Sequence, residues 1–175
     1  MPKISLLKIV ESTSVDGPGI RTSIYCAGCV NGCKGCHNPQ SWAIENGVRT
    51  DIEDIIKAIK NDDAHGVTFS GGDPMLQASS FTELARRIHN ELGKDIWCYT
   101  GYTLEEILND EVKKGLLAEV DVIVDGRFVL ELRDEDLLFR GSSNQRILDA
   151  KKSLKAGKAV TFNYNPYPDF GLKEK

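Results

Sequence analysis

The chain has 175 residues, of which 41% are hydrophobic, and it carries a formal net charge of −4 at pH 7. This length fits one domain with room for a hydrophobic core, and no repeat, low-complexity tract or linker divides residues 1–175. The acidic balance argues against nucleic acid as a partner, because phosphate binding needs a basic face. The N-terminal apolar run is too short for a signal peptide or a membrane span, so we expect a cytoplasmic protein with no membrane contact.

The first predicted elements are a strand over residues 21–26 and, directly after it, a loop with three cysteines. These are Cys29, Cys33 and Cys36, separated by three residues and then by two, with glycines between them that break helix and strand patterns. Three protein thiolates suit a 4Fe–4S cluster in which one iron lacks a protein ligand, because ferredoxin-type clusters are closed by four cysteines. An open position of this kind leaves room for a substrate, as it does in catalytic zinc sites.

Cys26 leaves two alternatives to the open cluster. It forms a Cys-x-x-Cys pair with Cys29, and Cys33 forms another with Cys36. All four thiolates could bind zinc, although only three residues separate the two pairs, which would crowd a tetrahedral site. They could also close a four-thiolate cluster. Five cysteines, four of them close together, are not typical of a secreted disulfide framework, and they favour a reducing cytoplasm.

After the cysteine loop, segments with helical and strand periodicity alternate. The helices are predicted to begin at the capping pairs Thr50/Glu53, Ser80/Glu83 and Thr103/Glu106, and the second of them to end at Gly93. The strands are predicted over residues 66–69, 96–100 and 120–124, with 159–162 as a later candidate. Strands joined by helices imply right-handed crossovers and a parallel sheet. A closed eight-unit barrel usually needs roughly 250 residues, so we expect an α/β fold that forms a partial, open parallel barrel.

Small or polar residues follow each predicted strand at its carboxyl end. After the cysteine loop come the stretches 70–74, 100–102 and 125–127. These ends share one edge of a parallel sheet, so we expect them to converge on the cluster. Gly71 and Gly72 would let the backbone approach a ligand closely, which suits an amino-acid-like ligand with an amino group and a carboxylate. Asp73 could add a charge there or cap a helix.

These motifs together resemble the radical S-adenosylmethionine superfamily, which combines Cys-x3-Cys-x2-Cys after a first strand with Gly-Gly-Asp-Pro after a second. The stretches Asp16-Gly-Pro-Gly-Ile-Arg21 and Cys36-His-Asn-Pro39 are similar to glycyl-radical-enzyme activases. Four further stretches narrow the resemblance to the activating proteins of anaerobic ribonucleoside-triphosphate reductase. They are Ser70-Gly-Gly-Asp-Pro74, Tyr99-Thr-Gly-Tyr102, Val124-Asp-Gly-Arg-Phe128 and Arg140-Gly-Ser-Ser-Asn-Gln-Arg146. The resemblance covers residues 9–149.

The resemblance implies two cofactors and the residues that bind them. The metal ligands of a 4Fe–4S cluster would be Cys29, Cys33 and Cys36, and S-adenosylmethionine would chelate the fourth iron through its amino and carboxylate groups. The backbone of Gly71 and Gly72 would bind the amino group. The residues expected beside the adenine or elsewhere on the cofactor are Gly35, Cys36, His37, Asp73, Thr100 and Asp125.

The resemblance also implies an oxidoreductase with a defined partner. One electron from the cluster would cleave the sulfonium, and the resulting 5′-deoxyadenosyl radical would remove hydrogen from a glycine in the large subunit of anaerobic ribonucleotide reductase. We further expect an electron donor such as a flavodoxin or ferredoxin, and a homodimer. The alternatives are activation of another glycyl radical enzyme, of the formate-lyase type, or a non-catalytic iron–sulfur or zinc-binding module.

Two positions depart from the superfamily's usual pattern. Gly35 stands where many members carry an aromatic residue, so His37 could supply the stacking ring, and Asp73 stands where glutamate is usual. Cys26 is extra to the pattern, and we expect it to be a small buried strand residue. Cys98, inside an apolar strand, should also be core packing. We expect the tail to be mobile from about residue 164.

Overall fold

The fold is built on one seven-stranded sheet in the order β3-β1-β2-β4-β5-β6-β7. The structure is a computed structural model that describes residues 2–164, so the tail that we expect to be mobile lies outside the described residues. The strands are β1 (Lys3–Thr13), β2 (Arg21–Cys26), β3 (Val48–Asp51), β4 (Gly66–Gly71), β5 (Asp95–Tyr99), β6 (Val122–Asp125) and β7 (Arg146–Asp149).

The four central strands, β2, β4, β5 and β6, are parallel, and the sheet is open. This confirms the predicted open parallel arrangement for the centre of the sheet. Antiparallel strands extend it on both sides, with β1 and β3 beyond β2 and β7 beyond β6. The sequence did not predict these three. The candidate strand at 159–162 was wrong, because it contributes only an isolated bridge between Leu148 and Thr161.

The helices are α1 (Ile52–Asn61), α2 (Ala78–Arg87), α3 (Leu104–Leu108), α4 (Glu111–Glu119) and α5 (Ala150–Ala156). Helices α1 to α4 lie in the connections between successive parallel strands, whereas α5 follows the antiparallel strand β7. Single turns of 3-10 helix lie at Pro39–Ser41, Ile44–Asn46, Pro74–Gln77 and Leu130–Leu132, and a π turn at Ile88–Leu92 extends α2. Helices α1, α2, α4 and α5 pack side by side in that order. Within residues 2–164 none of the helices has both the length and the apolar character needed to cross a bilayer.

One of the three predicted capping boxes is present. The Thr103 hydroxyl accepts from the Glu106 amide, and the Glu106 carboxylate accepts from the Thr103 amide, so the start of α3 is confirmed. The other two were wrong. The N-cap of α1 is Asp51, and α2 begins at Ala78 because the 3-10 turn before it leads directly into the helix. The predicted end at Gly93 is confirmed, since that residue adopts the left-handed conformation that glycine favours.

The sheet separates two apolar clusters, as alternate residues of β5 show. Ile96 and Cys98 belong to the larger core, in which the helices also bury their apolar residues. Trp97 belongs to a smaller cluster that includes Phe139 from the connection between β6 and β7. Cys98 is fully buried, which confirms it as a core residue. The helices therefore cover one face of the sheet, and the other face is closed in part by the β6–β7 connection.

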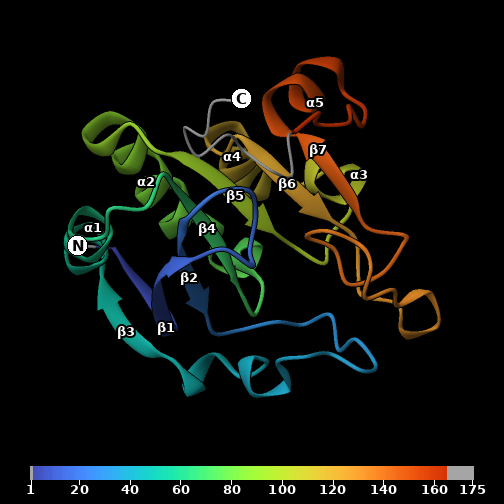
Figure 1. The fold of residues 1–175 in the computed structure, drawn as a ribbon, viewed down its shortest axis with the longest axis horizontal. Coiled ribbons are helices and arrows are strands. Elements are labelled where there is room, and N and C mark those ends of the chain that lie inside the picture. Colours follow the sequence, from blue (N-terminus) through green and yellow to red (C-terminus); the bar gives the residue numbers. More distant parts are fainter. Residues whose placement is uncertain (1, 165–175) are drawn as a thin grey trace, which may run out of the picture.

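Two long connections meet at the carboxyl ends of the parallel strands. In Figure 1 the connection from β2 to β3, residues 27–47, runs along the lower edge of the molecule, where β2 ends. The orange connection from β6 to β7 lies beside it, and the rings of His37 and Phe128, one from each connection, are 5.5 Å apart. Segments distant in sequence thus come together at one edge of the sheet.

Candidate functional site

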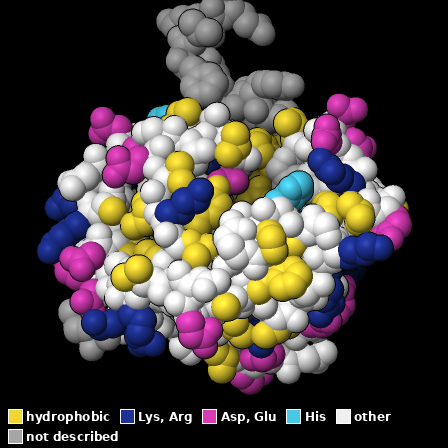
Figure 2. All heavy atoms as spheres, turned by 90° about the horizontal axis from the view of Figure 1, so that it is seen from below, with side chains coloured by type: hydrophobic (Ala, Val, Ile, Leu, Met, Phe, Trp, Pro, Cys, Tyr) yellow, Lys and Arg dark blue, Asp and Glu magenta, His cyan; other side chains and the backbone are white. Residues whose placement is uncertain are grey.

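A cavity of about 410 Å³ lies where these connections meet the strand ends. This volume is typical of sites for small molecules. Cys29, Cys33 and Cys36 all line it, and all three are half-buried. The other predicted site residues that line it are His37, Gly71, Gly72, Asp73 and Thr100. Figure 2 looks onto this edge, where hydrophobic side chains gather around a hollow and most charged side chains lie toward the margin.

Backbone hydrogen bonds hold the cysteine loop against the rest of the fold. The Gly28 amide donates to Ser41 O over 2.6 Å, and the Cys29 amide donates to Trp42 O over 3.1 Å. Two N–H groups point at cysteine sulfurs, since Asn31 Nδ2 lies 3.4 Å from Cys29 Sγ and the Asn38 amide lies 3.4 Å from Cys36 Sγ. Donors of this kind stabilise thiolates that bind iron. The loop is therefore suited to hold metal-bound sulfur.

The three thiols share one cavity wall without converging on a single point. Within residues 2–164 there is no group of three His, Cys, Asp or Glu side chains that could hold one metal ion. The thiolates of an iron–sulfur cluster bind separate irons, so they need to surround a cluster rather than meet at one ion. Three half-buried thiols around a cavity of this size therefore fit a 4Fe–4S cluster.

Cys26 is separated from the other three cysteines. It is the last residue of β2, it is fully buried in the larger core, and it does not line the cavity. Burial raises the pKa of its thiol, which disfavours the thiolate. The expectation that Cys26 is a buried strand residue is confirmed.

The two glycines after β4 are needed by the fold itself. A Cβ on Gly71 would lie 2.5 Å from both the backbone nitrogen and the oxygen of Cys26, and Gly71 has a φ of +101°. A Cβ on Gly72 would overlap the carbonyl oxygen of Gly28, while the Gly72 amide donates to Cys26 O over 2.7 Å. The double glycine thus lets β4 and the cysteine loop approach each other at the cavity wall.

Asp73 ties the loops of the wall together. Its carboxylate accepts hydrogen bonds from the amides of Met75 and Gly101, from the hydroxyl of Thr100 and from Nδ2 of Asn31. The bond to Met75 caps the 3-10 turn at 74–77, which was one of the two roles that the sequence suggested. Burial raises the pKa of Asp73, and these hydrogen bonds oppose that rise. The carboxylate is occupied by the protein's own donors.

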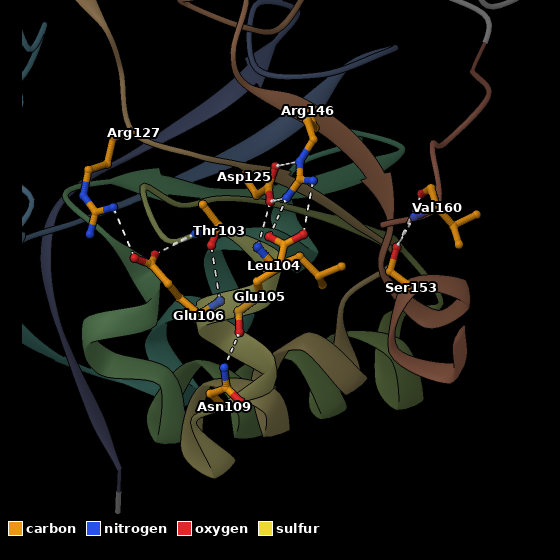
Figure 3. A network of polar contacts seen from close by, with 10 residues as sticks. All are labelled: Thr103, Leu104, Glu105, Glu106, Asn109, Asp125, Arg127, Arg146, Ser153 and Val160. Atoms are coloured by element: carbon orange, nitrogen blue, oxygen red, sulfur yellow. Dashed lines mark hydrogen bonds and ion pairs between the residues drawn. The ribbon is translucent and has the colours of Figure 1, made fainter. Parts of the chain in front are cut away.

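The structure does not bring Asp125 to the cavity. Gly126 lines the wall, but Asp125 lies behind it, 1% exposed, and accepts from the Leu104 amide over 2.7 Å and from Arg146 Nε over 3.0 Å. Figure 3 shows this network, in which Arg146 also reaches Glu105 on α3. The hydrogen bond from Arg146 lowers the pKa of Glu105. Asp125 therefore connects β6, β7 and α3.

Gly35 and His37 take different positions around the third cysteine. Gly35 does not line the cavity. It has a φ of +78°, and a Cβ there would lie 2.9 Å from Leu130 Cδ1. His37 lines the cavity together with Phe128, with their rings tilted by 57°. An aromatic surface is thus present although Gly35 replaces the usual aromatic residue.

Sequence reasoning gave no individual role to several residues of the wall, and three of these make informative contacts. Phe128 and Asp16 lay within motifs that were quoted only for their resemblance, and Asn31 was not singled out. Asp16 accepts hydrogen bonds from the hydroxyls of Ser23 and Tyr25, which fixes the turn before β2 against the cavity. Only the placement of Asp16 and Phe128 inside short motifs could have identified them. Asn31 lies between the first two cysteines of the cysteine loop, but its residue type gave no signal of a role.

Several known proteins are similar to this chain in sequence. Residues 15–148 match a family model described as a 4Fe-4S single cluster domain. A protein of Vibrio cholerae serotype O1 named anaerobic ribonucleoside-triphosphate reductase-activating protein is 43% identical over 141 residues, which cover 76% of this chain and 90% of that protein. The chain belongs to the family of anaerobic ribonucleoside-triphosphate reductase-activating proteins. The resemblance found in the sequence is confirmed.

Other members of the activating-protein family match over a similar span. The protein of the same name from Haemophilus influenzae is 36% identical over 152 residues, 82% of this chain and 97% of its own length. The one from Enterobacteria phage T4 is 33% identical over 148 residues, 80% of this chain and 90% of its own length. A solved structure, QueE from Escherichia coli, superposes with a TM-score of 0.47 at 17% identity over 58% of this chain and 54% of that chain.

Proposed function

We propose that this chain installs a glycyl radical on the large subunit of anaerobic ribonucleotide reductase, using a 4Fe–4S cluster and S-adenosylmethionine. The observation that carries the proposal is the division of the cysteines. Cys29, Cys33 and Cys36 line one cavity, and Cys26 is withdrawn into the core. A cluster held by three thiolates keeps one iron free for a small molecule, and the cofactors together supply one-electron cleavage of a carbon–sulfur bond.

Some residues of the wall would bind S-adenosylmethionine, and others would hold those residues in position. The backbone of Gly71 and Gly72 borders the cavity beside the cysteine loop and would bind the cofactor's amino group. His37 and Phe128 offer aromatic surface for the adenine. Asp73 and Thr100 hydrogen-bond each other, so they would hold the wall in place at the cofactor's edge. Asp125 would support the wall from behind, because it fixes the strand end before Gly126 to α3 and β7.

The remaining expectations concern the partners and the compartment. The partner would be the reductase after which the related activating proteins are named. Its glycine segment would enter the cavity from solvent. The electron would come from a donor such as a flavodoxin or ferredoxin. Three half-buried free thiols need reducing surroundings, which supports a cytoplasmic location. A homodimer remains a proposal.

The test is made with anaerobically reconstituted protein. Given S-adenosylmethionine and a strong reductant, it should yield 5′-deoxyadenosine and methionine. Addition of the reductase large subunit should produce a glycyl signal in electron paramagnetic resonance. Absence of cleavage by protein with full iron and sulfide content would exclude the activity. A glycyl signal that appears only on a different glycyl radical enzyme would show that the partner is that enzyme and not the reductase. Protein that contains zinc and no sulfide would show that the cysteines bind zinc and not an iron–sulfur cluster.

A further inference from the structure

Two buried side-chain polar atoms lack a hydrogen-bond partner within residues 2–164. They are Oδ1 of Asn31 and Nε of Arg140, and both residues line the cavity. A buried polar atom without a partner is costly, so such atoms commonly mark the place of a ligand or water. Asn31 is the more informative of the two, because it also contacts one of the cysteines.

The orientation of the Asn31 amide is set by its neighbours. Its Nδ2 donates to Asp73 Oδ2 over 2.9 Å and to Cys29 Sγ over 3.4 Å. Both partners are acceptors, so the NH₂ group must face them, and the carbonyl oxygen must face the other way. Gly101 makes room for this arrangement, because a Cβ at that position would overlap Nδ2.

Asn31 therefore joins the cysteine loop to the wall beside the double glycine. The Asp73 carboxylate accepts from four donors, whereas the Asn31 oxygen has no donor among residues 2–164. A neutral, buried acceptor at this position suits a ligand that brings an N–H group. In the proposed function that group is the amino group of the methionine part of S-adenosylmethionine, which the neighbouring Gly71–Gly72 backbone would also contact.

We propose that Asn31 acts on both cofactors: its NH₂ group donates to the Cys29 thiolate and raises the reduction potential of the cluster, and its Oδ1 accepts from the amino group of S-adenosylmethionine. The inference rests on the proposed function. An N–H donor to a ligating sulfur stabilises the reduced cluster more than the oxidised one, because the reduced cluster is more negative. One side chain would thus make the cluster easier to reduce and orient the molecule that receives the electron.

The experiment compares Asn31→Leu with wild type and with Asn46→Leu, all anaerobically reconstituted and matched for iron and sulfide. Asn46 is a fair control because it lies in the same connection, donates to Gln40 O over 2.8 Å and does not line the cavity. For Asn31→Leu we expect the equilibrium constant for one-electron reduction of the cluster to fall about tenfold, which lowers the reduction potential by about 59 mV. The dissociation constant for S-adenosylmethionine should rise about tenfold, as for loss of a charge-assisted hydrogen bond. Asn46→Leu should change neither.

A second variant separates the two contacts. Asn31→Asp keeps an oxygen that can accept, but it replaces the NH₂ donor with a second carboxyl group 2.9 Å from Asp73. The potential should therefore fall, through loss of the donor and through the added negative charge, while the affinity for cationic S-adenosylmethionine should not fall by more than about threefold. The potential is measured by redox titration followed by electron paramagnetic resonance, and the affinity by anaerobic equilibrium dialysis. A wild-type potential or a wild-type affinity in Asn31→Leu would overturn the corresponding half of the proposal.

A measurement on the unmodified sequence covers the case in which the variants assemble no cluster. Wild-type protein labelled with ¹⁵N at the asparagine side-chain amides should show a ¹⁵N hyperfine coupling to the reduced cluster, because Asn31 is the asparagine whose side chain donates to a cysteine sulfur among residues 2–164. Lack of that coupling would refute the thiolate contact. Failure of the wild type to bind S-adenosylmethionine would instead refute the proposed function, so the two failures are distinguishable.

Discussion

The cavity wall and the layer directly behind it are built from the same strand ends, yet they differ in what their side chains contact. Asp73 follows β4 and Asp125 ends β6, and both are 1% exposed. Asp73 lies on the wall, with the donors of two cavity loops directed at it, whereas Asp125 lies behind the wall and pairs with Arg146. The same difference separates two cysteines, since Cys29 lies on the wall and Cys26 lies in the core behind it. Position at a strand end thus does not decide which residues can reach a ligand.

The largest expected effect separates the cysteines. Cys29→Ser, Cys33→Ser or Cys36→Ser should each reduce iron and sulfide to background and abolish cleavage of S-adenosylmethionine, because each removes a ligand from a centre that has three. Cys26→Ser should keep the cluster and lose about 1–3 kcal/mol of stability, because it buries a hydroxyl. Iron and sulfide analysis with absorption spectra measures both. Loss of the cluster in Cys26→Ser would place that thiol among the ligands.

The two aspartates provide the next comparison. Asp73→Ala leaves the donors of Asn31, Thr100 and Gly101 unpaired, so we expect the free energy of unfolding to fall by about 3 kcal/mol or more and the affinity for S-adenosylmethionine to fall at least tenfold. Asp125→Ala should lower stability by about 2 kcal/mol, because it leaves the Leu104 amide without its acceptor and removes one of the two carboxylates that bind Arg146. It should leave the affinity within about twofold.

Urea unfolding of the cluster-free protein and anaerobic equilibrium dialysis measure these two quantities. In cluster-free protein no cofactor contributes to the free energy of unfolding, so a loss of stability in a variant is due to the lost hydrogen bonds. Equal losses of affinity in the two variants would show that the wall and the layer behind it act as one unit, and the distinction between them would not hold.

Gly71 and Gly93 test whether close backbone approach, rather than backbone conformation, sets the cost at the wall. Both have positive φ, but a Cβ on Gly71 would meet Cys26, whereas a Cβ on Gly93 would meet no atom of the described residues within 4 Å. Gly71→Ala should therefore cost about 3 kcal/mol or more, and Gly93→Ala about 1 kcal/mol. Denaturant titrations measure the difference, and similar costs would mean that the β2–β4 approach is not tight.

The sequence predicted the centre of the fold because its signals there are local. Isoleucines at helical spacing marked α1, and apolar runs bounded by glycine marked β4 and β5. The three antiparallel strands were missed for another reason, because β1, with eleven residues, and β3 and β7, with four each, are defined by pairing with distant partners. Length alone does not explain the misses, since β6 also has four residues and was predicted. The predicted helix starts at Thr50 and Ser80 were wrong. Asp51 is the N-cap of α1, and a 3-10 turn leads directly into α2.

The site was predictable where chemistry and spacing coincide, as in the three cysteines. It was not predictable where contacts alone decide a residue's role. Asp125 and Gly126 are adjacent, and only the second lines the cavity. The unpartnered oxygen of Asn31 and the ring of Phe128 beside His37 also depend on how two loops meet. No periodicity within either loop carries that information.

The smallest expected effect concerns the outer end of the Asp125 network. The hydrogen bond from Arg146 lowers the pKa of Glu105 in the folded protein. The ionised carboxylate therefore contributes stability above the unfolded pKa of about 4.3, and this contribution is lost as the pH falls through the folded pKa. Glu105→Gln should lower the free energy of unfolding by less than about 1 kcal/mol at pH 6, because Glu105 is 61% exposed.

The difference between wild type and Glu105→Gln should then shrink as the pH is lowered below about 4, and it should also shrink in 1 M salt, which screens exposed pairs. Urea unfolding at a series of pH values measures it. A difference that persists in acid would mean that the carboxylate's charge is not what Arg146 stabilises. In that case the network behind the wall would depend on packing of the Arg146 side chain against Asp125, and the mutation of Arg146 rather than of its partners would become the informative one.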